Sequence, residues 1–199
     1  MALGKSKEIK SRDLLDSVLV KSLHFVLFAN WINNKDGLND KSRNVHYDFK
    51  LLYRASRDGM DATIFHKKCD DKGATIFVAK IKNTKHVIGG YNPLYWTSSG
   101  KGVYNTTSDS FIFSFSDYSN GNEGKLGRVM GGEEHYEQYA IASYNGHGPI
   151  FGGKDIVSPN NGKWTSIPRV YPNLNIPTSY EIDDYEVFQK LGKVEIEAG

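Results

Sequence analysis

Beyond Gly73 the sequence is a series of short runs of β-branched and aromatic residues, separated by turn-forming residues. The runs are "ATIFVAKI", "HVIGGY", "SFIFSFSD", "YAIASY" and "IFGGKDIVS", with Gly, Asn, Asp and Ser between them. Residues of this kind suit pleated strands, and short strands separated by turn residues are typical of antiparallel sheets. We therefore predict a mainly β (α+β) fold, a sandwich of two antiparallel β-sheets with helices at its margins.

The chain before these runs has a different pattern. In and just before "KSLHFVLFANWI" the apolar residues recur every four positions, which predicts a helix with one face on the core. The recurring positions are Leu19, Leu23, Leu27 and Trp31, with Val26, Phe28 and Ile32 beside them. Next, "YDFKLLYRAS" has the alternation of a strand, and "SRDGMDATIFHKKC" predicts a short helix with Ser56 or Asp58 near its N-terminus and Cys69 at its end.

Turn and proline positions define three later segments. The turn "KNTKH" between two apolar runs predicts a hairpin over Ala74–Tyr91. In "KWTSIPRVYPNLNIPTSY" three prolines within ten residues exclude regular structure over most of the segment. The final "YEIDDYEVFQKLG" predicts a closing strand.

The length of 199 residues suits one globular domain with one sizeable core. We expect a disordered lead over 1–12, an N-terminal helix and linker loop over 13–45, the folded domain over 46–191, and a tail over 192–199. The lead is polar and rich in lysine, so it offers little apolar surface to bury.

The charges are balanced, with 25 basic and 23 acidic residues and a formal net charge of +2. Because no strong basic field results, nucleic acid is not an expected partner. The single cysteine, Cys69, has no partner for an internal disulfide, so we expect a reducing, cytoplasmic compartment. The longest apolar run, Val18 to Ile32, has polar interruptions and is too short for a membrane span, so we expect no membrane insertion.

Two interpretations of Cys69 compete. His66, Lys67 and Lys68 precede it closely, and a neighbouring base or cation would lower the thiol pKa and create a nucleophile or peroxide sensor. Alternatively, a cysteine at the end of an amphipathic helix is a small buried hydrophobe. The sequence leaves both interpretations open.

Other patterns favour no catalytic, metal or cofactor site. The six histidines include no pair four residues apart and there is no cysteine pair, so we predict no metal site. "GHGPIFGG" lacks the glycine spacing and strand-to-helix setting of a nucleotide loop, so we predict no cofactor. Glu134 and His135 have no partner defined by a motif, and no serine lies in a nucleophile elbow, so we predict that the protein is not an enzyme.

A longer set of motifs runs from residue 48 to residue 189. It begins with "LLYRASRDGMDATIFHKKCDDKGATIFVAKIKNTKHVIGGYNPLYW", continues with "TSDSFIFSFSD" and ends with "IDDYEVFQ". These motifs resemble a TLDc domain, and more narrowly the fungal and slime-mould branch in which such a domain follows a BTB region. The matching positions are Leu51, Leu52, Tyr53, Ser56, Arg57, Asp58, Gly59, Cys69, Gly89, Gly90, Tyr91, Pro93, Trp96, Asp109, Gly152, Gly153, Asp184, Tyr185, Glu186, Val187 and Phe188.

Two segments depart from the family pattern. Residues 105–108 lack a glycine-x-glycine, and the proline-rich Pro168 to Pro177 replaces a serine-rich segment near the C-terminus. The resemblance implies a two-sheet sandwich, an association with oxidation resistance, and binding of the vacuolar proton ATPase. It implies no catalytic constellation, and the BTB branch implies an adaptor that holds a client protein.

We therefore predict a noncatalytic protein-interaction domain whose partner is the vacuolar proton ATPase or an adaptor client. The predicted contact surface is aromatic and charged, and consists of Arg57, Asp58, Tyr95, Trp96 and His147. Two alternatives stay open: a thiol-based redox enzyme that uses Cys69, and a carbohydrate-binding sandwich whose aromatic side chains stack on sugars beside loop carboxylates and amides. The sequence leaves the identity of the partner and the oligomeric state open.

Overall fold

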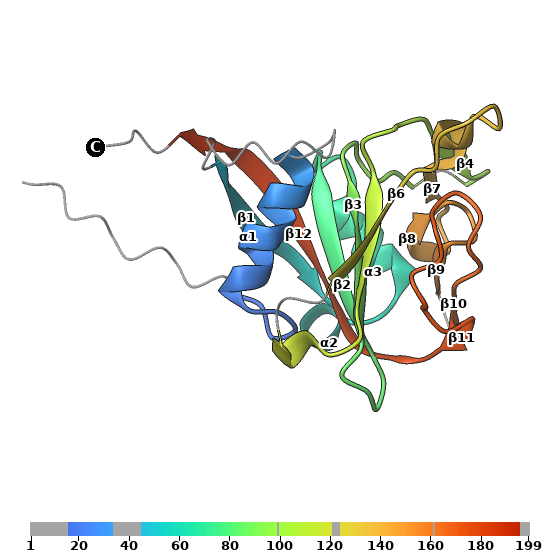
Figure 1. The fold of residues 1–199 in the computed structure, drawn as a ribbon. Helices are drawn as coiled ribbons and strands as arrows, with labels where there is room; N and C mark the ends of the chain where they lie inside the picture. Colours follow the sequence, from blue (N-terminus) through green and yellow to red (C-terminus); the bar gives the residue numbers. More distant parts are fainter. Residues whose placement is uncertain (1–15, 34–44, 99, 121–123, 161, 196–199) are drawn as a thin grey trace, which may run out of the picture.

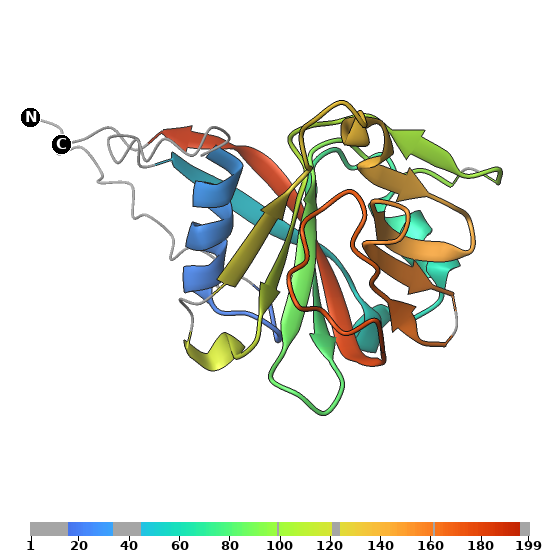
Figure 2. The same cartoon turned by 45° about the vertical axis from the view of Figure 1, so that its right-hand side comes forward.

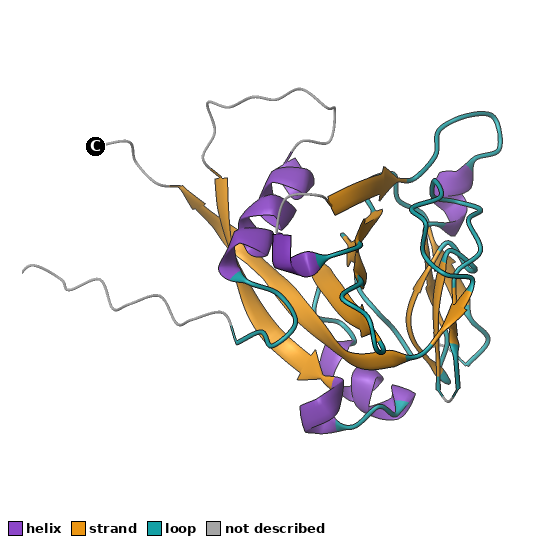
Figure 3. Ribbon diagram, turned by 60° about the horizontal axis from the view of Figure 1, so that its bottom comes forward, coloured by secondary structure: helices purple, strands orange, loops and turns teal. Residues whose placement is uncertain are grey.

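The structure, a computed structural model, describes residues 16–33, 45–98, 100–120, 124–160 and 162–195. Two antiparallel six-stranded sheets pack face to face, and helices lie at the margins of this sandwich (Figures 1 and 3). The predicted fold class is therefore confirmed. Within the described residues, no helix has the length and apolar character needed to cross a membrane. The predicted lead over 1–12 and residues 34–44 of the predicted linker loop lie outside the described residues.

The first sheet has the strand order β1-β12-β2-β3-β5-β6. Its members are β1 (Val45–Arg54), β2 (Thr75–Ile81), β3 (Val87–Asn92), β5 (Phe111–Phe115), β6 (Gly124–Arg128) and β12 (Ile182–Glu195). The predicted hairpin is β2 and β3, and the predicted closing strand is β12. Because β12 pairs with both β1 and β2, the last described strand lies inside this sheet. It continues to Glu195, into the range that the sequence assigns to a tail.

The second sheet has the order β11-β10-β9-β8-β7-β4. Its members are β4 (Val103–Asn105), β7 (Ile141–Ser143), β8 (His147–Phe151), β9 (Ile156–Pro159), β10 (Trp164–Thr165) and β11 (Ser179–Tyr180). Two 3-10 helices lie in the connecting loops, η1 (Tyr118–Asn120) after β5 and η2 (Tyr136–Tyr139) before β7. The proline-rich residues 166–178 between β10 and β11 contain no helix or strand, as predicted.

Helix α1 (Ser22–Asn33) covers the face of the first sheet that points away from the second sheet (Figure 2). The predicted helix is confirmed, and so is most of its predicted buried face, because Leu19, Phe28 and Ile32 are buried and Leu27 and Trp31 pack against the same core. The buried residues are His24, Phe25, Phe28, Ala29 and Ile32. By contrast, Leu23 and Val26 are 46% and 51% exposed. Apolar residues occur on more than one face of this helix, so their spacing alone does not identify the face that packs.

The central strands β2, β3 and β5 of the first sheet bury both of their faces. Ile76 and Val78 of β2 belong to a core beneath α1, whereas Phe77 and Ala79 belong to the core between the two sheets. Because both faces are buried, such strands are continuous apolar runs in the sequence rather than alternating ones. The molecule therefore has two apolar cores, one on each side of the first sheet.

The double glycine of β3 lets neighbouring chain segments approach closely. A Cβ on Gly89 would lie 2.2 Å from the Phe77 carbonyl oxygen and 2.3 Å from the Phe113 ring. A Cβ on Gly90 would lie 2.7 Å from the Phe151 ring. Neither position has room for a side chain, which explains the need for glycine at both.

The segment after β1 forms two short helices instead of the single predicted helix. They are α2 (Ala55–Asp58) and α3 (Ala62–Cys69), separated by a break at Gly59. The N-cap of α3 is Asp61, whose carboxylate accepts a hydrogen bond from the Thr63 N–H at 2.7 Å. Ser56 and Asp58 therefore belong to α2, while the predicted helix end at Cys69 is confirmed.

Candidate functional site

The five residues of the predicted contact surface do not share one environment. Tyr95 is 48% exposed, and Arg57 is exposed as well. Trp96 is only 1% exposed, so its assignment to the contact surface is wrong. Asp58 and His147 are partly buried. Within the described residues, no contact joins Arg57 to Tyr95 or His147.

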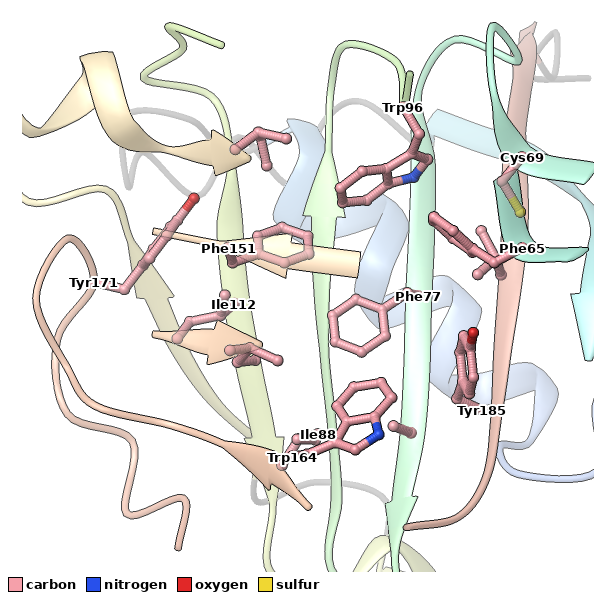
Figure 4. Packing of buried hydrophobic residues seen from close by; sticks show 14 of the residues in the cluster. Phe65, Cys69, Phe77, Ile88, Trp96, Ile112, Phe151, Trp164, Tyr171 and Tyr185 are labelled. Carbon is pink, nitrogen blue, oxygen red and sulfur yellow. The ribbon is translucent and has the colours of Figure 1, made fainter. Parts of the chain in front are cut away.

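Trp96 lies in the core between the two sheets (Figure 4). Its ring meets Phe65 and Phe151 in edge-to-face geometry, with ring centroids 5.7 Å and 5.8 Å away. The indole N–H donates to Thr75 Oγ1 at 2.9 Å, so the polar atom of the ring is also satisfied inside the fold. The aromatic-proline-tryptophan motif therefore supplies a core anchor.

Asp58 is held by donors from three elements. Its Oδ2 accepts from the Arg54 backbone N–H at 3.0 Å and from Arg57 Nη2 at 2.8 Å. Lys68 Nζ lies 3.0 Å from Oδ1. The Arg57 hydrogen bond is the main interaction that holds the pKa of Asp58 well below its usual range. Asp58 thus joins β1, α2 and α3, and its carboxylate is engaged within the fold.

Two buried carboxylates of β12 fasten the same corner. Asp184 accepts from Ser56 twice, through the backbone N–H at 2.9 Å and through the hydroxyl at 2.5 Å. Glu186 is fully buried, and it accepts from Arg54 Nε at 2.7 Å and from the Val18 N–H at 3.0 Å. These contacts connect β12 to two other segments. One is the junction of β1 and α2, and the other is the segment before α1.

Cys69 is fully buried in the core between the sheets, where it lies beside Phe65 (Figure 4). Burial raises the pKa of the Cys69 thiol far above its usual range, and the negative charge of Asp70 raises it further. A peroxide-reactive thiol needs exposure and a lowered pKa, so the redox interpretation of Cys69 is wrong. The residue is a small buried hydrophobe.

We expect iodoacetamide to leave Cys69 unlabelled in the folded protein between about pH 7 and about pH 9, because the thiolate is the reactive form and burial disfavours it. Mass spectrometry of the native and the denatured chain measures this, and complete labelling after denaturation is the control for an intact thiol. Labelling of the native protein with a rate midpoint at or below about 8.5 would restore the redox interpretation.

A pocket of about 660 Å³ opens beside α3. Its lining residues are Thr63, His66, Lys67, Asp70, Asp71, Ser98 and Asn145. The ring of His66 is fixed on both sides, with Nδ1 2.8 Å from Asp70 Oδ1 and Nε2 2.9 Å from the Tyr144 carbonyl oxygen. The Ser98 hydroxyl donates to Asp70 rather than to His66, so this set lacks the nucleophile-base order of a catalytic triad.

Four ring side chains form a strip that leads away from this pocket, and we name Tyr139, Tyr104, Tyr144 and His147 the aromatic strip. The ring centroids of Tyr104 and Tyr139 are 5.4 Å apart, and those of Tyr144 and His147 are 5.6 Å apart. Partial burial and a hydrogen bond to Tyr144 raise the pKa of Tyr104. Burial lowers the pKa of His147.

The pocket and the aromatic strip are neighbours, because Asn145 of the pocket follows Tyr144 in the chain and His66 bonds the Tyr144 carbonyl. Of the aromatic strip, only His147 was a predicted site residue. The three tyrosines come from β4, η2 and the turn after β7, and their local sequences do not reveal that they meet. Among the described residues, no group of three or more His, Cys, Asp or Glu side chains is arranged to hold a metal ion.

A family model described as the TLDc domain matches residues 17–189. The chain belongs to the TLDc domain family. A comparison with curated proteins found no match. The family match starts at residue 17, so it includes α1, which the sequence analysis placed ahead of the domain.

This TLDc domain has a buried carboxylate that the sequence analysis did not identify. Asp155 is 1% exposed, and its Oδ1 accepts from three consecutive backbone N–H groups. The donors are Arg169 at 2.8 Å, Val170 at 3.0 Å and Tyr171 at 2.9 Å. Burial raises the pKa of Asp155, and these donors oppose the shift. Asp155 therefore holds the proline-rich segment of the TLDc domain in place.

The TLDc signature glycines explain how Asp155 reaches this position. Gly152 and Gly153 lie in the turn after β8 with φ values of +64° and +68°, a backbone conformation that favours glycine. A Cβ on Gly152 would lie 1.9 Å from Asp155 Oδ2, so the carboxylate occupies the space that a side chain would need. The remaining signature position, Asp109, directly precedes Ser110 and β5, and its N–H donates to Thr107 Oγ1 at 3.1 Å.

Proposed function

We propose that this TLDc domain is a noncatalytic protein-interaction module. The observation that carries the proposal is the outer face of α1, where Leu23 and Val26 lie three residues apart and are 46% and 51% exposed. Val18, in the segment before the helix, is also exposed. Apolar side chains that gather on the outer face of a helix are typical of a protein-binding surface.

The signature residues support the same proposal by their contacts. Four of them form hydrogen bonds within the domain, namely Ser56, Asp58, Asp184 and Glu186. These hydrogen bonds give each of the four a structural role. Arg57 and Tyr95 are the exposed members of the predicted contact surface, and each is a separate candidate contact for the same partner.

The proposed partner is the vacuolar proton ATPase or a client protein held by an adaptor. The resemblance to the BTB-TLDc branch of fungi and slime moulds motivates the adaptor role, and the family's association with oxidation resistance motivates a role in the oxidative-stress response. For both proposed roles, the adaptor role and the role in the oxidative-stress response, we propose a cytoplasmic location.

A binding assay with purified vacuolar proton ATPase tests the proposal. We expect the double variant Leu23→Glu/Val26→Glu to bind at least about tenfold more weakly than the wild type, since two charges replace the apolar contact. Glutamate is a good helix former, so α1 is expected to persist. Circular dichroism and the melting temperature verify that the variant folds.

Two control variants define the outcome. Met60→Glu changes an exposed apolar residue between α2 and α3 and is expected to bind like the wild type. The single variants Arg57→Ala and Tyr95→Ala test the two exposed residues of the predicted contact surface. Full binding by a folded Leu23→Glu/Val26→Glu variant would remove α1 from the contact surface, and absence of wild-type binding to the ATPase would remove that partner.

A further inference from the structure

We propose that the pocket beside α3 and the aromatic strip together bind a short, uncharged oligosaccharide. This activity goes beyond the proposed protein interaction and uses a different part of the surface. In Figure 2, α1 lies on one side of the first sheet, whereas β4, β7 and β8 lie on the other side. A protein on α1 and a glycan in the pocket are therefore compatible.

The chemistry of the pocket matches sugar hydroxyls. Lys67, Asp71 and Asn145 are exposed at its rim, and within the described residues no hydrogen bond or ion pair occupies their side chains. An ammonium group donates, a carboxylate accepts and an amide does both, whereas each sugar hydroxyl both donates and accepts. The pocket thus presents the mixture of free donors and acceptors that a polyhydroxylated ligand needs.

The aromatic strip supplies the second requirement, a stacking surface. Tyr104 and Tyr139 are exposed, and their rings support each other edge to face at 5.4 Å. Tyrosine loses little conformational entropy on binding and combines an apolar ring with a polar hydroxyl, which suits the apolar C–H face of a sugar and its hydroxyl rim. Because the strip extends beyond the pocket, the ligand is an oligosaccharide rather than a single sugar.

The same residues disfavour other ligand classes. The lining of the pocket contains no apolar side chain, whereas the centre of a protein interface is depleted in charged residues and rich in apolar ones. Asp70 and Asp71 oppose a phosphorylated or otherwise anionic ligand, because Lys67 is the only lysine or arginine that lines the pocket. A neutral glycan does not need an apolar lining, and the two carboxylates do not repel it.

A glycan array probed with the fluorescently labelled chain tests the proposal, followed by calorimetric titration of the strongest hit. We expect neutral oligosaccharides among the hits. Tyr104→Ala, Tyr139→Ala and Asn145→Ala are each expected to weaken the hit by about tenfold or more. All three residues are exposed, so the variants are expected to fold, and their melting temperatures check this.

Two matched variants separate stacking from other effects. Tyr104→Phe keeps the ring and removes the hydroxyl, so it is expected to bind within about threefold of the wild type. Tyr95→Ala removes an exposed tyrosine outside the strip and is expected to change nothing.

Three results would overturn the proposal. The first is an array on which no glycan binds. The second is a glycan hit whose affinity is unchanged in both Tyr104→Ala and Asn145→Ala. The third is an array without hits together with loss of vacuolar proton ATPase binding in Tyr104→Ala/Tyr139→Ala. The last result would assign the strip to a protein partner. The proposed protein interaction fails separately, because its test uses variants of α1.

Discussion

Replacing Trp96 by alanine is expected to lower the free energy of unfolding by about 3–5 kcal/mol, the range found when a buried aromatic residue is truncated to alanine. The indole is 1% exposed and packs against Phe65 and Phe151 between the two sheets. Truncation leaves a cavity there and also removes the donor that Thr75 Oγ1 accepts from. Equilibrium unfolding in urea measures the loss.

The neighbouring residue provides the matched control. Tyr95 is 48% exposed, so Tyr95→Ala is expected to change the free energy of unfolding by no more than about 0.5 kcal/mol. Similar losses for the two variants would show that Trp96 is not the buried anchor described here. Weak partner binding by Trp96→Ala would report unfolding rather than a lost contact, so this variant is unsuitable for mapping the interaction surface.

Replacing Asp155 by alanine is expected to cost several kcal/mol, because each buried N–H that loses its acceptor costs about 1–3 kcal/mol. Two such groups, on Val170 and Tyr171, lose the Asp155 carboxylate together, and the partly buried N–H of Arg169 loses it as well. The proline-rich segment contains no helix or strand, and this carboxylate holds it together with the burial of Val170, Tyr171 and Leu174 in the core. Limited proteolysis is therefore expected to cut within residues 166–178 of the variant before the sheets unfold.

Two further variants test the mechanism for Asp155. Asp155→Asn keeps an acceptor oxygen at the Oδ1 position, so we expect it to lose less stability than Asp155→Ala. Glu181→Ala removes an exposed carboxylate whose ion pair with Lys82 is at the surface, and its effect is expected to stay below about 1 kcal/mol. If Asp155→Ala and Glu181→Ala were equally stable, the backbone hydrogen bonds to Asp155 would not hold the segment.

Much of the fold was predictable because its signals are local. The hairpin of β2 and β3 follows from two apolar runs around one turn, and the irregular segment between β10 and β11 follows from its prolines. The end of α3 at Cys69 was also predicted. The break at Gly59 was not, because a helix pattern that continues on both sides of one glycine conceals it.

The candidate site was much less predictable, since it depends on which distant residues meet. His147 was identified, but Tyr104 in β4 and Tyr139 in η2 gain significance only through their ring contact. Asp155 was missed because its three partners are backbone groups 14 to 16 residues away, which leave no trace in side-chain identity.

The sequence by itself determined the class of the fold, most strand positions and the family, because apolar periodicity, turn residues and signature motifs act over short distances along the chain. Only the tertiary structure decided which apolar residues face inward. The outer face of α1 and the inward position of Trp96 depend on packing against strands far away in the chain, and a local pattern with apolar residues on every side leaves that choice open.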